Sequence, residues 1–155
     1  MKILFVCQGN ICRSPMAEVI CRFHLDAEGL SDQVSVCSAG TSGWHVGEPA
    51  DRRTVAELEG NGYVIDHVAR RIDDRISTVD FVIVFDHHQV DYLASFEYPV
   101  RRLLMLGSFD PEIGSDDIDD PFHQEQEAFR AIRIRLERAM PSLIDYVRAE
   151  LARTT

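Results

Sequence analysis

The sequence predicts an α/β protein: a single domain over residues 1–155, built as a three-layer sandwich with a four-stranded parallel sheet and helices on both faces. Short apolar runs alternate along the chain with segments of helical periodicity, the order expected when right-handed crossovers join parallel strands. The apolar runs are nearly continuous, as in strands that are covered on both faces. A chain of 155 residues can also bury a sufficient core without disulfides or metal.

The first half of the chain predicts two strands and two helices. Residues 2–6, KILFV, form a continuous apolar run typical of a buried strand. Pro15 suits the first turn of a helix that ends near Gly29. The run VSVCSA at 34–39 predicts a second strand, and the helical spacing over 51–60 ends at a Gly-Asn-Gly run.

The second half repeats this alternation. The run DFVIVF at 80–85 is the strongest strand pattern in the chain, and a helix is expected over 88–96. A fourth strand is predicted at 101–106, followed by a long closing helix from 125 to about 151. Pro141 lies inside that last stretch, so a kink or a restart of the helix is expected there.

Composition excludes several classes of partner. The formal net charge is −10, from 26 acidic and 16 basic residues, which argues against nucleic acid as a partner because phosphate backbones are bound by basic surfaces. No apolar run approaches the ~20 residues of a membrane span, so no membrane partner is expected. The N-terminus does not resemble a secretory signal. A cytoplasmic location is therefore expected, with export by another route left open.

The four cysteines are expected to be free thiols, because the chain lacks the signal that accompanies disulfide frameworks. Cys7 and Cys12 fit only the loosest spacing of zinc ligands. Cys21 and Cys37 do not form a second ligand pair, and the charge of Arg13 would repel a metal ion. We therefore expect no metal site and no cofactor.

Cys7 ends the first predicted strand, at the edge of a parallel sheet where ligands bind. The following loop contains Gly9 and Asn10, the residue types most tolerant of positive φ, so its N–H groups can turn inward around an anion. The next helix points its positive end at the same place. Arg13 adds a planar guanidinium that binds two phosphate oxygens, and Ser14 can donate a hydrogen bond to the sulfur.

An isolated cysteine after a buried strand is most often an inert core residue. Here the Gly-Asn pair and the Arg-Ser-Pro sequence favour chemistry instead. A nucleophile, an anion-binding loop and a cation lie within eight residues, which predicts phosphoryl transfer through a cysteinyl-phosphate at Cys7.

The segment VCQGNICRSPMAE (6–18) resembles the signature of the low-molecular-weight protein tyrosine phosphatases, V-C-x-G-N-x-C-R-S-P. The resemblance extends over nearly the whole chain, through SAGTSGWHVGEPAD (38–51), DHVARRI (66–72), FDHHQ (85–89) and DDPF (119–122). The segment WHVG resembles bacterial, especially actinobacterial, members. The resemblance implies a four-stranded parallel sheet flanked by helices, no metal or organic cofactor, and a phosphotyrosine-containing protein as substrate. Inorganic phosphate or vanadate would then bind in the active site.

The resemblance also implies a general acid, which the family places immediately before a proline. This selects Asp120, before Pro121, from the four aspartates of DDIDDPF (116–122). Asp119 is the second candidate. Without the resemblance, this segment would be interpreted as a solvated acidic loop.

Further roles follow from the same resemblance. Ser38 and His67, together with Asn10 and Ser14, match a hydrogen-bond network that holds the loop. Asp86 is expected to support the loop or to pair with Arg13, and Arg70 either helps to neutralise the ligand or is a solvated arginine. The pocket walls are expected from Ile11, Trp44 and Phe122, and the other substrate contacts from the loop itself: Gln8, Gly9, Asn10, Cys12 and Ser14. Four histidines have no role that the sequence indicates: His45, His87, His88 and His123.

Three other functions are alternatives to the hydrolysis of phosphotyrosine. Protein-arginine phosphatases resemble this chain but carry threonine where it has Ile11. Thiol-linked arsenate reductases need further cysteines for a disulfide relay, and none follows Cys37. A phosphotyrosine-binding module would lack either the nucleophile or the acid, and both are present.

Overall fold

Four short strands form a parallel sheet at the centre of the structure, a computed structural model that describes residues 1–155. They are β1 (Lys2–Cys7), β2 (Ser35–Gly40), β3 (Phe81–Val84) and β4 (Leu103–Met105). Their order across the sheet is β2-β1-β3-β4, and each neighbouring pair is parallel. The predicted fold class is confirmed.

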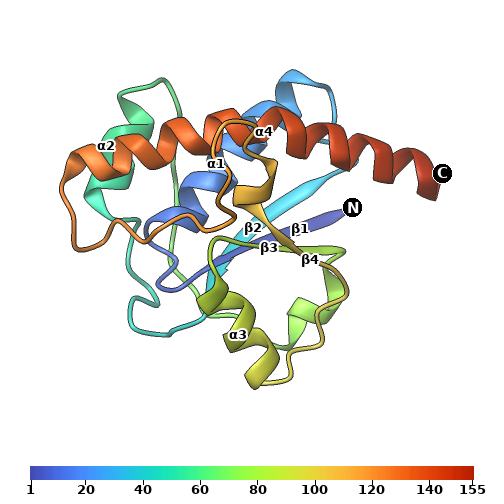
Figure 1. Ribbon diagram of the computed structural model, residues 1–155, viewed down its shortest axis with the longest axis horizontal. Coiled ribbons are helices and arrows are strands. Elements are labelled where there is room, and N and C mark those ends of the chain that lie inside the picture. The colour runs from blue at the N-terminus through green and yellow to red at the C-terminus, as the bar shows by residue number, and fades with distance from the viewer.

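Helices cover both faces of this sheet (Figure 1). On one face, α4 (Gln126–Thr154) crosses α1 (Arg13–Ala27) and α2 (Arg52–Glu59). On the other face lies α3 (His87–Ser95), with a 3₁₀ turn at Asp74–Thr78. The result is the expected three-layer arrangement.

The strands are continuous apolar runs in the sequence because successive side chains enter two different cores. Ile3 and Phe5 of β1 pack in the large core under α1 and α4. Leu4 and Val6 point the other way, into a smaller core that includes Leu93 of α3. Burial on both faces thus explains why β1 shows no polar alternation.

The structure refines two expectations about the second half. The fourth strand covers only Leu103–Met105 rather than 101–106. The closing helix continues through Pro141 as one element, so of the expected kink or restart, the restart does not occur. A proline inside a helix costs about 3 kcal/mol. The flanking residues Met140, Leu143 and Ile144 are almost fully buried, and burying each such side chain contributes about 1.5–3 kcal/mol, so packing outweighs the cost.

The carboxyl ends of β1 and β3 lie side by side and lead through short loops into α1 and α3. This edge of the sheet is where an open α/β fold binds its ligands. None of the helices combines the length and the apolar character that a membrane span requires.

Candidate active site

The loop between β1 and α1 carries the residues predicted to bind phosphate. Asn10 has a positive φ of 56°, which an asparagine tolerates better than most residues. Gly9, in contrast, does not have a positive φ. A Cβ on Gly9 would lie 3.1 Å from Cδ2 of His45, so any larger residue there would displace the His45 side chain slightly. Of the two residues expected to tolerate a positive φ, only Asn10 therefore adopts one.

Asn10 is fully buried and all of its polar side-chain atoms are used. Its Nδ2 donates to Ser14 Oγ at 2.8 Å and to Ser38 Oγ at 3.0 Å. Its Oδ1 accepts a bond from the Arg70 N–H at 2.9 Å, and its carbonyl oxygen lies 2.7 Å from His67 Nε2. The loop is thus held in shape from three separate segments of the chain.

Cys7 lies at the base of this loop with only 2% of its surface exposed. Its sulfur lies 2.9 Å from Ser14 Oγ and accepts a bond from the Asn10 N–H at 3.3 Å. Cys12 is also buried, and burial is the main cause that raises the pKa of its thiol well above the ordinary value. Cys12 therefore remains a neutral thiol.

Arg13 is almost completely buried, at 2% exposure, and its guanidinium is fixed at two points. Nη1 donates to Asp86 Oδ2 at 2.6 Å and to the Ile118 carbonyl at 2.7 Å. Burial works to lower the pKa of Arg13, but the neighbouring Cys7, Asp86 and Asp120 raise it overall. Arg13 therefore remains a cation in an interior position.

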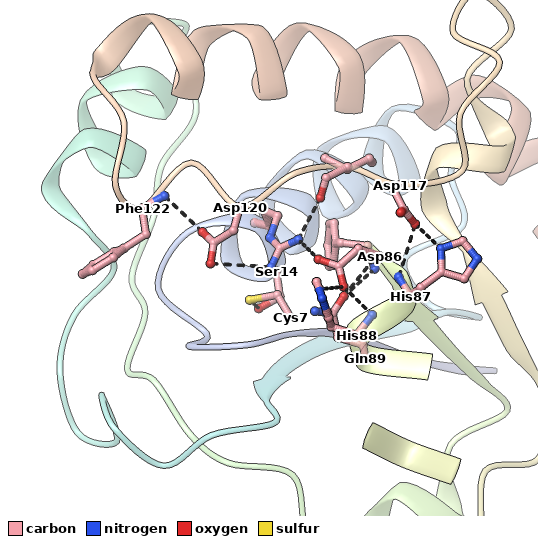
Figure 2. Close-up of polar contacts among 12 residues, drawn as sticks. Cys7, Ser14, Asp86, His87, His88, Gln89, Asp117, Asp120 and Phe122 are labelled. Carbon is pink, nitrogen blue, oxygen red and sulfur yellow. Dashed lines mark hydrogen bonds and ion pairs between the residues drawn. The ribbon is translucent and has the colours of Figure 1, made fainter. Parts of the chain in front are cut away.

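Asp120 reaches the same site from the segment before α4. Its Oδ2 lies 3.8 Å from Arg13 Nη2, and its Oδ1 accepts a bond from the Phe122 N–H at 3.1 Å. Figure 2 shows Asp120 over Cys7 and Ser14. Asp119 does not line the cavity, whereas Asp120 does. The geometry thus favours the first of the two aspartates considered as acid.

These groups surround a cavity of about 160 Å³. Its apolar wall comes from Ile11, which is 6% exposed, and from Trp44 and Phe122 at the mouth. Trp44 is 78% exposed, so its indole ring packs little against the rest of the protein. The other residues around the cavity are Cys7, Gln8, Gly9, Cys12, Arg13, His45, Asp120 and His123.

Some supporting contacts were not visible in the sequence. A Cβ at Gly40 would lie 2.6 Å from the Gln8 carbonyl oxygen, so only glycine lets β2 approach the loop. The Ile118 carbonyl accepts a hydrogen bond from Arg13 although the isoleucine side chain carries no polar group.

Arg70 donates its Nε to the Ser38 carbonyl at 2.9 Å and does not line the active-site cavity. Of its two expected roles, ligand neutralisation therefore lacks support.

His87 also has a contact that the sequence did not indicate. Its Nδ1 lies 2.6 Å from Asp117 Oδ1, and this pair joins the start of α3 to the segment that carries Asp120 (Figure 2). Ile118 N donates to the Phe85 carbonyl beside it at 2.6 Å. The acid-bearing segment is therefore tethered next to the end of β3.

A nucleophilic sulfur, an anion-binding loop, a buried guanidinium and a carboxylate meet in one cavity. This set can bind a phosphate group, form a bond to its phosphorus and protonate the departing oxygen. No group of three or more potential ligands among histidine, cysteine, aspartate and glutamate is arranged to hold a metal ion. The fold and the site together define a cysteine-dependent phosphoryl-transfer protein.

Comparison with known proteins agrees with this class. Residues 2–153 match the family model described as low molecular weight phosphotyrosine protein phosphatase. Low molecular weight protein-tyrosine phosphatase A of Mycobacterium tuberculosis is 39% identical over 155 residues, covering 99% of this chain and 95% of that protein. The chain therefore belongs to the low molecular weight phosphotyrosine protein phosphatase family and is a phosphoric monoester hydrolase that acts on phosphoproteins.

Two solved structures illustrate the breadth of similar folds. A protein tyrosine phosphatase from Entamoeba histolytica, with Hepes in its active site, superposes with a TM-score of 0.89 at 28% identity, covering 97% of this chain and 98% of that chain. The Drosophila arginine phosphatase superposes with a TM-score of 0.84, also at 28% identity, covering 95% of this chain and 98% of that chain. The fold alone therefore does not distinguish a phosphotyrosine substrate from a phosphoarginine substrate.

Proposed function

We propose that this protein hydrolyses phosphotyrosine in protein substrates through a cysteinyl-phosphate on Cys7. The observation that carries the proposal is the cavity itself, in which Ile11 of the phosphate loop gives an apolar wall and two aromatic side chains border the mouth. An aryl ring has large apolar faces that such walls bury favourably. The 39% identity to a protein named as a tyrosine phosphatase supports the same substrate class.

In the first step, the substrate phosphate binds between the loop N–H groups and Arg13, as inorganic phosphate or vanadate would. The Cys7 sulfur attacks phosphorus while the bond to the tyrosyl oxygen breaks, and the Asp120 carboxyl donates its proton to that oxygen. The products are free tyrosine hydroxyl, a cysteinyl-phosphate and an Asp120 carboxylate. The loop donors and Arg13 stabilise the charge that develops on the transferring phosphoryl group.

In the second step, the Asp120 carboxylate removes a proton from water, and the water oxygen attacks phosphorus. The phosphorus–sulfur bond breaks, which returns the electron pair to Cys7 and releases inorganic phosphate. Ser14, 2.9 Å from the sulfur, stabilises the departing thiolate by donating a hydrogen bond. Asp120 is again protonated, so the cycle closes without a metal or an organic cofactor.

The competing function is hydrolysis of phosphoarginine on the same scaffold. A phosphorylated guanidinium presents N–H groups on all its edges, and Ile11 offers them no acceptor. Unpaired polar groups cost about 1–3 kcal/mol, and the lower end of this range is about tenfold in rate. We therefore expect phosphotyrosine to be favoured over phosphoarginine by at least about tenfold, and over the shorter phosphoserine by more.

Variants of the apolar wall test this substrate assignment. Ile11→Thr supplies a hydroxyl beside the loop, so it is expected to narrow the preference for phosphotyrosine over phosphoarginine peptides. Trp44→Ala removes binding area for the ring and is expected to raise KM for aryl phosphates more than it lowers kcat. Asp119→Asn serves as the control, because Asp119 does not line the cavity. A phosphotyrosine preference that is unchanged in Ile11→Thr would contradict the proposed role of the wall.

A further inference from the structure

An open groove adjoins the mouth of the active-site cavity and shares Gln8 and Trp44 with it. Its volume is about 720 Å³. It extends from the turn at residues 41–43, over Arg71, to α3, where His88 and Tyr92 form its far side. A phosphoprotein whose phosphorylated side chain enters the cavity would therefore extend over this groove.

Arg71 is the only arginine or lysine in the lining of the groove, and no aspartate or glutamate lines it. Its Nη2 donates to the Tyr92 hydroxyl at 2.9 Å and its Nε to the Thr41 carbonyl at 3.3 Å. Tyr92 is itself packed against Phe96, with ring centroids 4.6 Å apart. The guanidinium is thus oriented by neutral partners that do not cancel its charge.

Arg71 has no carboxylate partner, a feature that it shares with the exposed Arg52 and Arg130 but not with Arg75. Arg75, four residues later, lies 2.6 Å from an Asp73 carboxylate oxygen. No carboxylate of the chain pairs with Arg71 within 4.0 Å, and its Nη1 has no partner in the protein. A guanidinium has five N–H donors, so most of those of Arg71 are available to a ligand.

The positive charge of Arg71 contrasts with the negative charge of the chain as a whole. The chain carries a formal net charge of −10, which disfavours the approach of acidic protein segments. Arg71, whose charge no carboxylate of the chain neutralises, gives such segments one place of electrostatic attraction in the groove beside the cavity. Carboxylates match the planar guanidinium in geometry as well as in charge.

We propose that the groove binds an acidic side chain of the phosphoprotein substrate, close in sequence to the phosphorylated tyrosine, through Arg71. The inference rests on the proposed phosphotyrosine function and adds a preference for acidic sequence context. An extended peptide advances about 3.3 Å per residue, so positions within three residues of the phosphotyrosine lie within reach of the groove.

The test compares phosphotyrosine peptides that carry glutamate or glutamine at each of the three positions on either side. We expect glutamate to raise kcat/KM about two- to fivefold at one or more positions, the range of an exposed ion pair. Arg71→Gln should remove this preference, and Arg71→Glu should reverse it. Added salt should weaken the preference in the unmodified enzyme.

Two controls separate a subsite from a general charge effect. Arg130→Gln removes the same charge from an exposed position on α4 and should preserve the glutamate preference. p-Nitrophenyl phosphate has no flanking residue, so its hydrolysis should be the same in the unmodified enzyme and in Arg71→Gln.

Three results would overturn the inference or its basis. Equal rates for all glutamate and glutamine peptides would exclude an acidic subsite. If Arg71→Gln lowers kcat/KM equally for acidic and neutral peptides, Arg71 has a structural role only. Failure to hydrolyse the neutral phosphotyrosine peptide, with p-nitrophenyl phosphate still cleaved, would instead overturn the proposed function, and the subsite with it.

Discussion

Replacing Asp86 with asparagine tests how the buried Arg13 guanidinium is held. In the native protein, Asp86 Oδ2 lies 2.6 Å from Arg13 Nη1, and Arg13 is only 2% exposed. Asparagine keeps the size of the side chain, and it is as good an N-cap as aspartate. The cap of α3, in which Asp86 Oδ1 accepts the His88 N–H at 2.8 Å, should therefore survive. The change removes mainly the negative charge beside Arg13.

The expected loss of stability follows from this burial. Breaking a buried ion pair by removing one partner costs about 3–5 kcal/mol, because the remaining charge is left uncompensated in the interior. The Ile118 carbonyl still accepts one bond from Arg13. The asparagine oxygen that caps α3 replaces Asp86 Oδ1, so an Nδ2 donor takes the place of Oδ2 and cannot accept the bond from Arg13. We therefore expect the free energy of unfolding to fall by about 3–5 kcal/mol. A displaced guanidinium should also lower kcat/KM by up to about a hundredfold.

Urea unfolding followed by circular dichroism measures this loss. Asp73→Asn provides the matched control, because Asp73 also caps a helical turn and pairs with an arginine at 2.6 Å, but at the surface. Exposed pairs contribute at most about 1 kcal/mol. If Asp86→Asn destabilises the protein no more than Asp73→Asn, the buried pair contributes no more to stability than the exposed one.

The same pair predicts a pH dependence. Burial works to raise the pKa of the Asp86 carboxyl, but the bond to Arg13 and the attraction of its charge lower it overall from the ordinary value of 3.8. A carboxyl whose pKa is lowered by folding stabilises the protein above its unfolded pKa, and this stabilisation is lost as pH falls through the folded value. The difference between the native protein and Asp86→Asn should thus be constant from pH 5 to 7 and shrink below about pH 4.

Three further outcomes are expected. Asp120→Asn should slow hydrolysis of phenolic phosphates about 10²–10⁴-fold, with a smaller loss for acidic leaving groups; equal losses across a leaving-group series would exclude an acid role. Peroxide should oxidise the Cys7 thiolate to a sulfenic acid, which the Cys12 thiol converts to a disulfide with release of water; mass spectrometry without this crosslink would contradict it. His87→Ala, which breaks the contact with Asp117, should slow phenolic substrates about two- to tenfold, and an unchanged leaving-group dependence would show that the contact does not position the acid.

The fold was predictable because the strands are buried on both faces and interrupted by clear helix signals. Continuous runs such as DFVIVF leave little alternative to a parallel sheet. The ends of elements were less predictable, since they depend on tertiary packing. Pro141 illustrates this, because buried neighbours on both sides keep the helix continuous despite the unfavourable residue.

The arrangement of the loop was also predictable, because Cys7 and Arg13 lie in one local motif whose geometry is set by short-range constraints. Contacts that depend on distant backbone atoms were not. The carbonyl of Ile118 and the space left by Gly40 follow only from how separate segments meet. The uncompensated charge of Arg71 is likewise invisible in sequence, where it is one of two adjacent arginines.

Selection of phosphotyrosine by the cavity can be measured with peptides of otherwise identical sequence that carry phosphotyrosine, phosphoserine or phosphoarginine. With a chelator present, we expect the unmodified protein to cleave phosphotyrosine at least about tenfold faster than phosphoarginine, measured as kcat/KM, and phosphoserine most slowly. Equal or faster cleavage of the phosphoarginine peptide would contradict this expectation and assign the protein to the arginine phosphatases.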